Sequence, residues 1–250
     1  MAIHRKSREE IKLMKQAGNV VALVHQAMRE AVKPGVSTKQ LDRIAEEIIR
    51  ENKCIPTFLG YNGFPGTICA SVNEQVVHGI PSDDVILKAG DIIAVDVGAT
   101  FRGMVGDSAW TYAVGEISPD LKKLLETTEK ALYAAIDAAR GDEPLENVSA
   151  AIEDIANAAN YGIVRQYGGH GVGHKMHEEP FVYNYRTGNQ LILKSGMTIA
   201  LEPMINLGCD DVYTLSDKWT VVTSDAKPSA HFEHTILITD GEAEILTKLL

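Results

Sequence analysis

The sequence predicts an α/β domain in which one order of elements occurs twice. Two segments with helical spacing of apolar residues are followed by short, glycine-punctuated strands, and the same order then repeats. The two halves fall at about residues 1–115 and 116–250. Because no low-complexity linker separates them, we expect a single domain, with a site at the junction of the halves.

The first half opens with two amphipathic helices. Ser7 with Glu10 forms a capping-box pattern, and apolar residues then recur at helical spacing as far as the next Pro-Gly pair. Ser37 with Gln40 opens a second helix of the same kind. From about residue 55 to 115 the pattern predicts strands, in the runs TICASVN, QVVHGIP, DIIAVDVGA and MVGDSAWTYAVG.

The second half repeats this order. Ser118 and Pro119 make an N-cap and first-turn pair for a helix that ends at Gly141, and PLENVSAAIEDIANAAN supplies the next helix. After Gly162 the strand-like runs MTIALEPMI, WTVVTS and HFEHTILIT follow.

Composition limits the classes of function. The chain has 34 acidic and 24 basic residues, a net charge of −10 and no run of Lys or Arg, so nucleic acid is not an expected partner. A charged start and the lack of any run of 18 apolar residues predict no signal peptide, no membrane span and a cytoplasmic location. Three widely spaced cysteines predict free thiols rather than a disulfide.

Residues 168–180, GGHGVGHKMHEEP, combine four glycines with three histidines. A zinc-binding helix is disfavoured, because each glycine destabilises a helix by about 1 kcal/mol and the zincin pattern needs Glu directly after its first His. The glycine spacing also fails to match a dinucleotide-binding loop. We therefore predict a loop or irregular strand, in which glycines let the backbone approach a site and histidines supply lone pairs.

Two aspartates interrupt the strand-like sequence of the first half. Asp96 and Asp107 lie eleven residues apart, and a hairpin centred between Phe101 and Arg102 would place them opposite each other. Two facing carboxylates require a cation between them, whereas both residues could equally cap turns beside glycine.

Two glutamates interrupt apolar runs of the second half. Glu202 lies in MTIALEPM and Glu233 in HFEHTILIT, where an unpaired buried carboxylate would be costly, although either could be salt-bridged or exposed at a strand end. Together with Asp96, Asp107 and His170 they form an oxygen-rich set with one histidine. Such a set suits two divalent ions, with Mn, Fe, Co or Zn all compatible.

The segments VNEQVVHGIP, DVGATFRGMVGDSAWTY, GGHGVGHKMHEEP, LEPM and EHTILIT, in this order and spacing, closely resemble the type I methionine aminopeptidases over nearly the whole chain. The resemblance implies the pita-bread fold, with two pseudosymmetric halves around a curved antiparallel sheet and helices outside. It also implies a dinuclear metallo-exopeptidase that removes the initiator methionine from nascent proteins with a small second residue. The chain itself starts Met1-Ala2, a substrate sequence by that rule.

By position, the resemblance implies five metal ligands: Asp96, Asp107, His170, Glu202 and Glu233. Asp107 and Glu233 would bridge the ions. A water or hydroxide between the ions would be the nucleophile, and Glu202 would be the general base or proton shuttle.

The resemblance completes the catalytic set with two histidines. His78 and His177 would lie beside the scissile peptide and stabilise its developing charge. By residue type alone, His78 would be a histidine at a strand end before a turn. His174 matches no functional position of the family, and we interpret it as a structural or surface histidine.

A methionine pocket is implied at four further residues: Tyr61, Phe64, Cys69 and Trp219. As residue types they would suit an ordinary core equally well. Phe58 and Met176 depart from the cysteine and the aromatic residue common in bacterial relatives, which leaves the exact pocket shape open. The same analogy implies a monovalent-cation site of backbone oxygens near Asn73, Gln75 and Ser229.

Other functions remain to be distinguished. X-Pro aminopeptidases and prolidases share the metal cluster and fold but usually carry an N-terminal domain, for which a first helix starting at Ser7 leaves no room. A non-catalytic pita-bread binding module, or a metal-free hydrolase of the creatinase kind, would have no use for five polar ligands. We expect a monomer that acts on the N-termini of nascent polypeptides. That role implies work near the ribosome, although no residue shows contact with it.

Overall fold

The structure is a computed structural model that describes residues 3–250, so the Met1-Ala2 start lies outside the described residues. The four predicted helices are confirmed as α1 (Arg8–Ala31), α2 (Thr38–Glu51), α3 (Pro119–Ala138) and α4 (Glu146–Ala159). The first two begin with complete capping boxes, in which a serine side chain accepts from the N3 amide and the N3 side chain accepts from the serine amide. Among residues 3–250, no helix has the length and apolarity that crossing a bilayer requires.

The strands form four antiparallel sheets. The first contains β1 (Ile55–Pro56), β2 (Ile68–Val72), β4 (Ile92–Phe101) and β5 (Met104–Ala113). The second contains β3 (Gln75–Val77), β11 (Val212–Thr214) and β12 (Val221–Thr223), and the third contains β6 (Gly162–Ile163), β10 (Met204–Asn206) and β13 (Ser229–His231). The fourth contains β7 (Gly169–Gly171), β8 (Glu178–Val182), β9 (Thr198–Leu201), β14 (His234–Leu237) and β15 (Glu244–Ile245).

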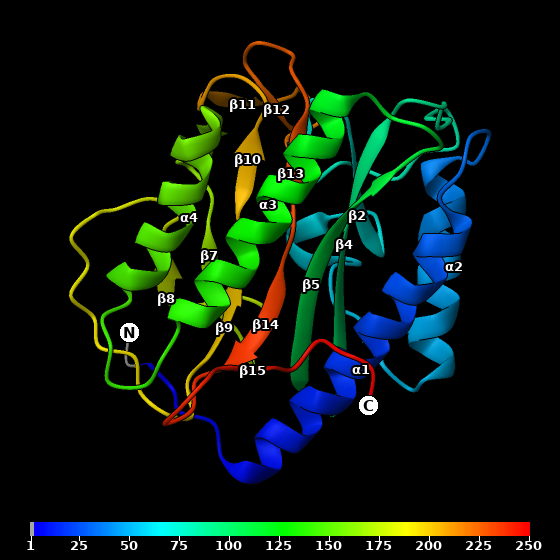
Figure 1. The fold of residues 1–250 in the computed structure, drawn as a ribbon. Helices are drawn as coiled ribbons and strands as arrows, with labels where there is room; N and C mark the ends of the chain where they lie inside the picture. The colour runs from blue at the N-terminus through cyan, green and yellow to red at the C-terminus, as the bar shows by residue number, and fades with distance from the viewer. Residues whose placement is uncertain (1–2) are drawn as a thin grey trace.

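Helices cover the outside of these sheets (Figure 1). α1 crosses β4 and β5, with α2 beside it, whereas α3 and α4 cover the strands of the second half, including β9, β10 and β13. Each helix pair encloses its own apolar cluster. The C-terminal segment runs back to α1 (Figure 1), where the Leu250 amide donates to the Asn19 side chain at 2.9 Å.

The two halves meet where β5 lies beside β13 and β14, a junction that we call the seam. Three hydroxyl groups, of Ser108, Thr111 and Thr235, donate to main-chain carbonyls across the seam at 2.6, 2.7 and 2.8 Å. Asp107 comes from one side of the seam and Glu233 from the other. Side chains therefore join the first sheet to its neighbours here, and they hold two predicted metal ligands together.

The β4–β5 hairpin differs from the prediction by a shift of two residues. Phe101 pairs with Met104, so the turn consists of Arg102 and Gly103 rather than being centred between 101 and 102. Both turn residues have positive φ, at 47° and 82°. A two-residue type I′ hairpin loop requires this conformation, which glycine adopts readily, and the turn therefore forms around Gly103.

The shift changes which residues face the two aspartates. Asp96 lies opposite Ala109, and Asp107 lies opposite Gly98, so the predicted direct pairing of the aspartates is wrong. A displacement of two residues preserves the alternation of side chains along a strand. Both carboxylates therefore still project from the same face of the sheet, as diagonal neighbours.

Candidate metal centre and substrate cavity

One cavity of about 560 Å³ contains the predicted site. Its lining includes all the residues predicted for metal binding, catalysis and the methionine pocket: Asp96, Asp107, His170, Glu202, Glu233, His78, His177, Tyr61, Phe64, Cys69 and Trp219. Sequence reasoning did not assign several other lining residues, among them Tyr167, Phe181 and His231.

The acidic end of the cavity is built from both sides of the seam. Asp96 projects from β4 and Asp107 from β5, Glu202 directly follows β9, and Glu233 lies between β13 and β14. His170 is the central residue of β7. Five backbone segments that are distant in sequence thus bring their polar side chains to one place.

His170 presents a lone pair to this cluster. Its Nδ1 lies 2.8 Å from the Gly171 carbonyl oxygen, which can only accept, so Nδ1 carries the proton. Its Nε2 lies 3.6 Å from Asp107 Oδ2 and 3.5 Å from Glu202 Oε1. Burial lowers the pKa of His170 to about 3, so the ring is neutral at physiological pH. A lone pair therefore faces two carboxyl groups.

The carboxyl groups themselves lie in an environment that opposes negative charge. Burial raises the pKa of Asp96 to about 7. Burial, followed by the charges of neighbouring carboxylates, raises the pKa values of Asp107, Glu202 and Glu233 well above their usual range. Bringing four such groups together is costly unless positive charge compensates them.

The donor set fits a divalent metal ion. Within residues 3–250, the buried atoms Asp96 Oδ1, Asp107 Oδ1 and Glu233 Oε1 have no hydrogen-bond partner. Asp107, His170 and Glu233 also offer ligand atoms that lie within 4.8 Å of one another. Carboxylate oxygens with one imidazole suit Mn, Fe, Co or Zn, and such an ion would satisfy these unpaired atoms.

His231 is a member of the site that sequence reasoning missed. Its side chain is buried, and its Nε2 lies 3.9 Å from Glu202 Oε2 and 3.8 Å from Glu233 Oε2. Burial, and then the nearby His78, lower the pKa of His231 to about 3. The available signal was its position two residues before Glu233, since alternate residues of an extended chain share a face.

His78 also lines the cavity. It follows β3 and adopts a left-handed backbone conformation with φ of 60°, which is uncommon for a residue with a Cβ. Its ring makes edge contacts with Tyr167 and Trp219, at centroid distances of 5.7 and 6.3 Å. Burial lowers the pKa of His78 to about 4, so this imidazole is neutral.

His177 lies at the open end of the same cavity. Its Nδ1 is 2.9 Å from the Tyr61 hydroxyl, and its ring centroid is 4.3 Å from that of His170. Burial of part of the ring lowers its pKa. The structure therefore brings both predicted catalytic histidines to the cavity, together with Tyr61.

The remaining wall is apolar. Phe58, Phe64, Cys69 and Met176 are buried in one cluster, against which Trp219 packs. The rings of Phe64 and Trp219 meet edge to face at 5.1 Å. Burial raises the pKa of the Cys69 thiol well above its usual range, so this residue is a neutral thiol; all three cysteines are free.

The glycines around His170 serve strand packing. A Cβ at Gly169 would collide with the Ala200 carbonyl, and a Cβ at Gly171 would collide with the Glu179 carbonyl. The close approach is thus between β7 and neighbouring backbone and not, as the sequence predicts, between the backbone and the site. Small residues here allow β7 to be sandwiched tightly, and this fixes His170.

Four residues that the sequence singled out lie outside the cavity lining: His174, Asn73, Gln75 and Ser229. His174 is exposed, with its Nε2 2.6 Å from Glu10 Oε1. At the predicted monovalent-cation site, the Asn73 carbonyl accepts from the Ser229 amide at 2.9 Å, and the Gln75 side chain accepts from the Val72 amide at 3.0 Å. The structure thus brings Asn73 and Ser229 into contact.

Comparisons with known proteins agree with this geometry. The model of a family described as metallopeptidase family M24 matches residues 12–240. Methionine aminopeptidase 1 of Bacillus subtilis (strain 168) is 51% identical over 245 residues, which cover 98% of this chain and 98% of that protein.

Solved structures give the same result. The crystal structure of methionine aminopeptidase from Thermotoga maritima has a TM-score of 0.97 and 42% identity, covering 99% of this chain and 100% of that chain. Prolidase from Pyrococcus furiosus has a TM-score of 0.80 at 22% identity, covering 98% of this chain and 65% of that chain, which shows the fold alone. The predicted pita-bread fold and the resemblance seen in the motifs are confirmed.

Proposed function

This chain belongs to metallopeptidase family M24, and from that premise we propose that its cavity releases N-terminal methionine from polypeptides by hydrolysing the first peptide bond. The protein is a hydrolase, and within that class it is a metal-dependent aminopeptidase. One observation carries the proposal: a single cavity joins a cluster of unpaired buried carboxylates to an apolar wall of suitable chemistry for a thioether side chain.

Two divalent ions, drawn from Co, Mn, Fe and Zn, would be held by Asp96, Asp107, His170, Glu202 and Glu233. When bound, such ions polarise the scissile carbonyl and lower the pKa of water, which provides a nucleophile at neutral pH. The unpaired oxygens of Asp96, Asp107 and Glu233, and the His170 lone pair, support this assignment.

Glu202 accepts the proton of the attacking water and passes it to the leaving amine. It is suited to this because its side chain is partly accessible from the cavity, with one oxygen beside His170 and the other beside His231. A carboxylate in that position can exchange a proton without leaving the site.

His78 and His177 stabilise charge that develops on the substrate. Both are neutral at physiological pH because burial lowers their pKa values, so each acts as a hydrogen-bond donor and not as a fixed charge. In the tautomer whose Nδ1 accepts the Tyr61 hydroxyl, the Nε2–H of His177 remains free for the substrate.

Phe64, Cys69 and Trp219 bind the methionine side chain, and Tyr61 lies at the rim. Phe58 and Met176, which differ from the residues implied by the resemblance, form part of the same wall. A monovalent cation near Asn73 and Ser229 would stabilise the contact between the β2–β3 turn and β13.

The proposed substrates are nascent polypeptides with a small second residue. On this proposal, the enzyme acts on them in the cytoplasm, near the ribosome. We also propose that the protein acts as a monomer.

The test is methionine release from a Met-Ala-Ser peptide by chelator-stripped protein, before and after addition of Mn or Co. An Ala-Pro peptide is assayed beside it. Metal-dependent release from Met-Ala-Ser alone is the expected result. Cleavage of Ala-Pro instead would indicate an X-Pro aminopeptidase or prolidase activity. Cleavage of neither peptide would favour a non-catalytic binding module.

A further inference from the structure

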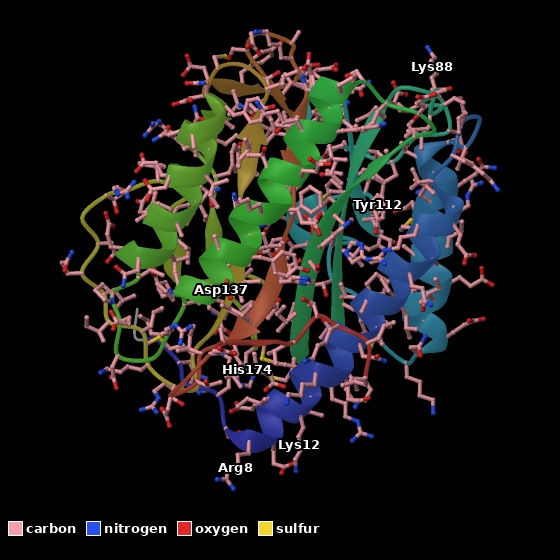
Figure 2. The ribbon with its side chains drawn as sticks, viewed as in Figure 1. Arg8, Lys12, Lys88, Tyr112, Asp137 and His174 are labelled. Carbon is pink, nitrogen blue, oxygen red and sulfur yellow. The ribbon has the colours of Figure 1, made fainter. Side chains whose placement is uncertain are left out.

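A second cluster of metal-ligating side chains lies outside the cavity, at the start of α1. His4, Glu10 and His174 each offer one ligand atom, and these atoms lie within 4.8 Å of one another. Figure 2 shows His174 near the first turns of α1, where Arg8 and Lys12 are labelled. None of the three is among the residues that line the cavity within the described part of the chain.

We propose that His4, Glu10 and His174 form a separate binding site for a divalent ion of the Zn, Ni or Cu class, which fastens the N-terminal segment to the loop between His170 and His177. Two imidazoles and one carboxylate form the donor set that such borderline ions prefer. Because His4 and His174 are exposed, solvent water can complete the coordination of the ion.

Glu10 is already oriented for this role. One of its oxygens, Oε2, accepts from the Ser7 amide at 2.6 Å as part of the capping box, and the other, Oε1, lies 2.6 Å from His174 Nε2. The hydrogen bonds from Ser7 lower the pKa of Glu10 to about 2, so the carboxylate is ionised throughout the physiological range. The cap fixes one oxygen and directs the other towards the histidine.

The backbone that carries His4 is also held in place. The Arg5 side chain donates to the Ser195 carbonyl at 2.6 Å, and the Lys6 amide donates to the Gly196 carbonyl at 2.6 Å. The ring of His4 lies edge to face against that of His174, with centroids 5.4 Å apart. The held backbone therefore presents three ligand atoms that already lie within 4.8 Å of one another.

One nearby positive charge is already compensated. The ammonium of Lys6 is paired with Glu178 at 2.7 Å. In the absence of an ion, His174 Nε2 carries the proton that it donates to Glu10. Binding transfers this proton to water, and the ion then takes its position between Nε2 and Oε1.

An ion at this cluster would affect the loop that carries two residues of the cavity. His174 lies three residues before His177 and two before Met176, and both of these line the cavity. An ion at the cluster would link this loop to the start of α1, in addition to the Lys6–Glu178 pair, and would restrict the motion of the loop.

Native mass spectrometry of the full chain, stripped with chelator and then exposed to zinc chloride, tests the site. His4→Ala and His174→Ala should each retain one zinc ion fewer than wild type, with affinity for that ion reduced at least about tenfold. Glu10→Gln should do the same while it preserves the fold, because Gln at N3 maintains a capping box. Glu9→Gln, at the neighbouring exposed carboxylate that pairs with Lys12, is the matched control and should bind as wild type does.

Tryptic cleavage of the N-terminal segment tests whether the ion holds this segment in place. Zinc should slow tryptic cleavage after Arg5 and Arg8 in wild type and in Glu9→Gln, and it should have no effect in His174→Ala. An equal zinc count in wild type and all three cluster variants would overturn the proposal. So would tryptic cleavage of wild type at the same rate with and without zinc.

Discussion

His170 and Asp107 face each other across the cavity, with 3.6 Å between the imidazole Nε2 and the carboxylate Oδ2. The proton of His170 is on Nδ1, which donates to Gly171, so the atom that faces Asp107 is a lone pair. Without a cation, this arrangement sets two acceptors against each other. A metal ion between them would compensate both groups.

We expect Asp107→Asn to lose metal and activity together. An amide replaces one oxygen by a donor, so kcat should fall by more than the roughly 10–100-fold that loss of an outer partner of a metal site causes. Metal content by atomic absorption and methionine release are the measurements. Asp137→Asn, on the exposed face of α3 (Figure 2), is the control. Full metal retention by Asp107→Asn would remove this residue from the ligand set.

His231 should position Glu202 through their contact at 3.9 Å. We expect His231→Leu to lower kcat about tenfold, since an apolar side chain leaves Glu202 with a changed partner and a changed basicity. His231→Gln should retain most of the activity, because its side-chain amide keeps a polar group beside Glu202. The pH–rate profile of each variant checks this: its acid limb should move in His231→Leu, and an unmoved limb with wild-type kcat would exclude the role.

The buried His25 should make the protein less stable in mild acid. Its Nε2 donates to the Ser108 carbonyl at 3.0 Å, and its Nδ1 lies 2.9 Å from the hydroxyl of Tyr112 (Figure 2). Burial lowers the pKa of His25 from 6.5 to about 4. The folded state therefore binds fewer protons than the unfolded state between these values, and the stabilisation present above pH 6.5 is lost as pH falls towards 4.

The measurement is the free energy of unfolding in urea across this range, for wild type and His25→Gln. Wild type should lose about 1.4 kcal/mol per pH unit more than the variant, which corresponds to one proton. Other buried histidines contribute equally to both proteins and cancel in the difference. Parallel curves would show that His25 is not the group responsible.

Gly98 should control the width of the methionine pocket through Phe58. A Cβ at position 98 would collide with the Phe58 ring, which must then move within the cavity lining. We expect Gly98→Ala to lower kcat/KM for a methionine substrate about tenfold, as a pocket changed by one methyl group does. Phe58→Leu in the same chain should restore it. If Phe58→Leu does not restore kcat/KM, the added methyl group acts instead by disturbing Asp107, which lies opposite Gly98.

The helices could be predicted from sequence because their signals are local. Ser7 with Glu10, and Ser37 with Gln40, specify a cap and its partner within four residues, and both boxes are present as expected. The five predicted ligands also converge on one cavity, because polar residues inside apolar strands have few other ways to be satisfied.

What could not be predicted depends on longer distances. The hairpin register was off by two because its turn is set by the positive φ of Arg102 and Gly103, a conformation that the spacing of the aspartates does not reveal. The role of His231 depends on Glu202, which reaches it from another strand, so the sequence showed only that a histidine precedes Glu233. The pairing of β10 with β13, in which Met204 lies opposite His231, brings it close to Glu202.

The seam divides the predicted metal ligands between the two halves of the chain. Asp107 and Glu233 stand on opposite sides of a junction joined mainly by hydroxyl groups. A chain cut in the connection at 114–117 would leave each fragment with an incomplete set of ligands.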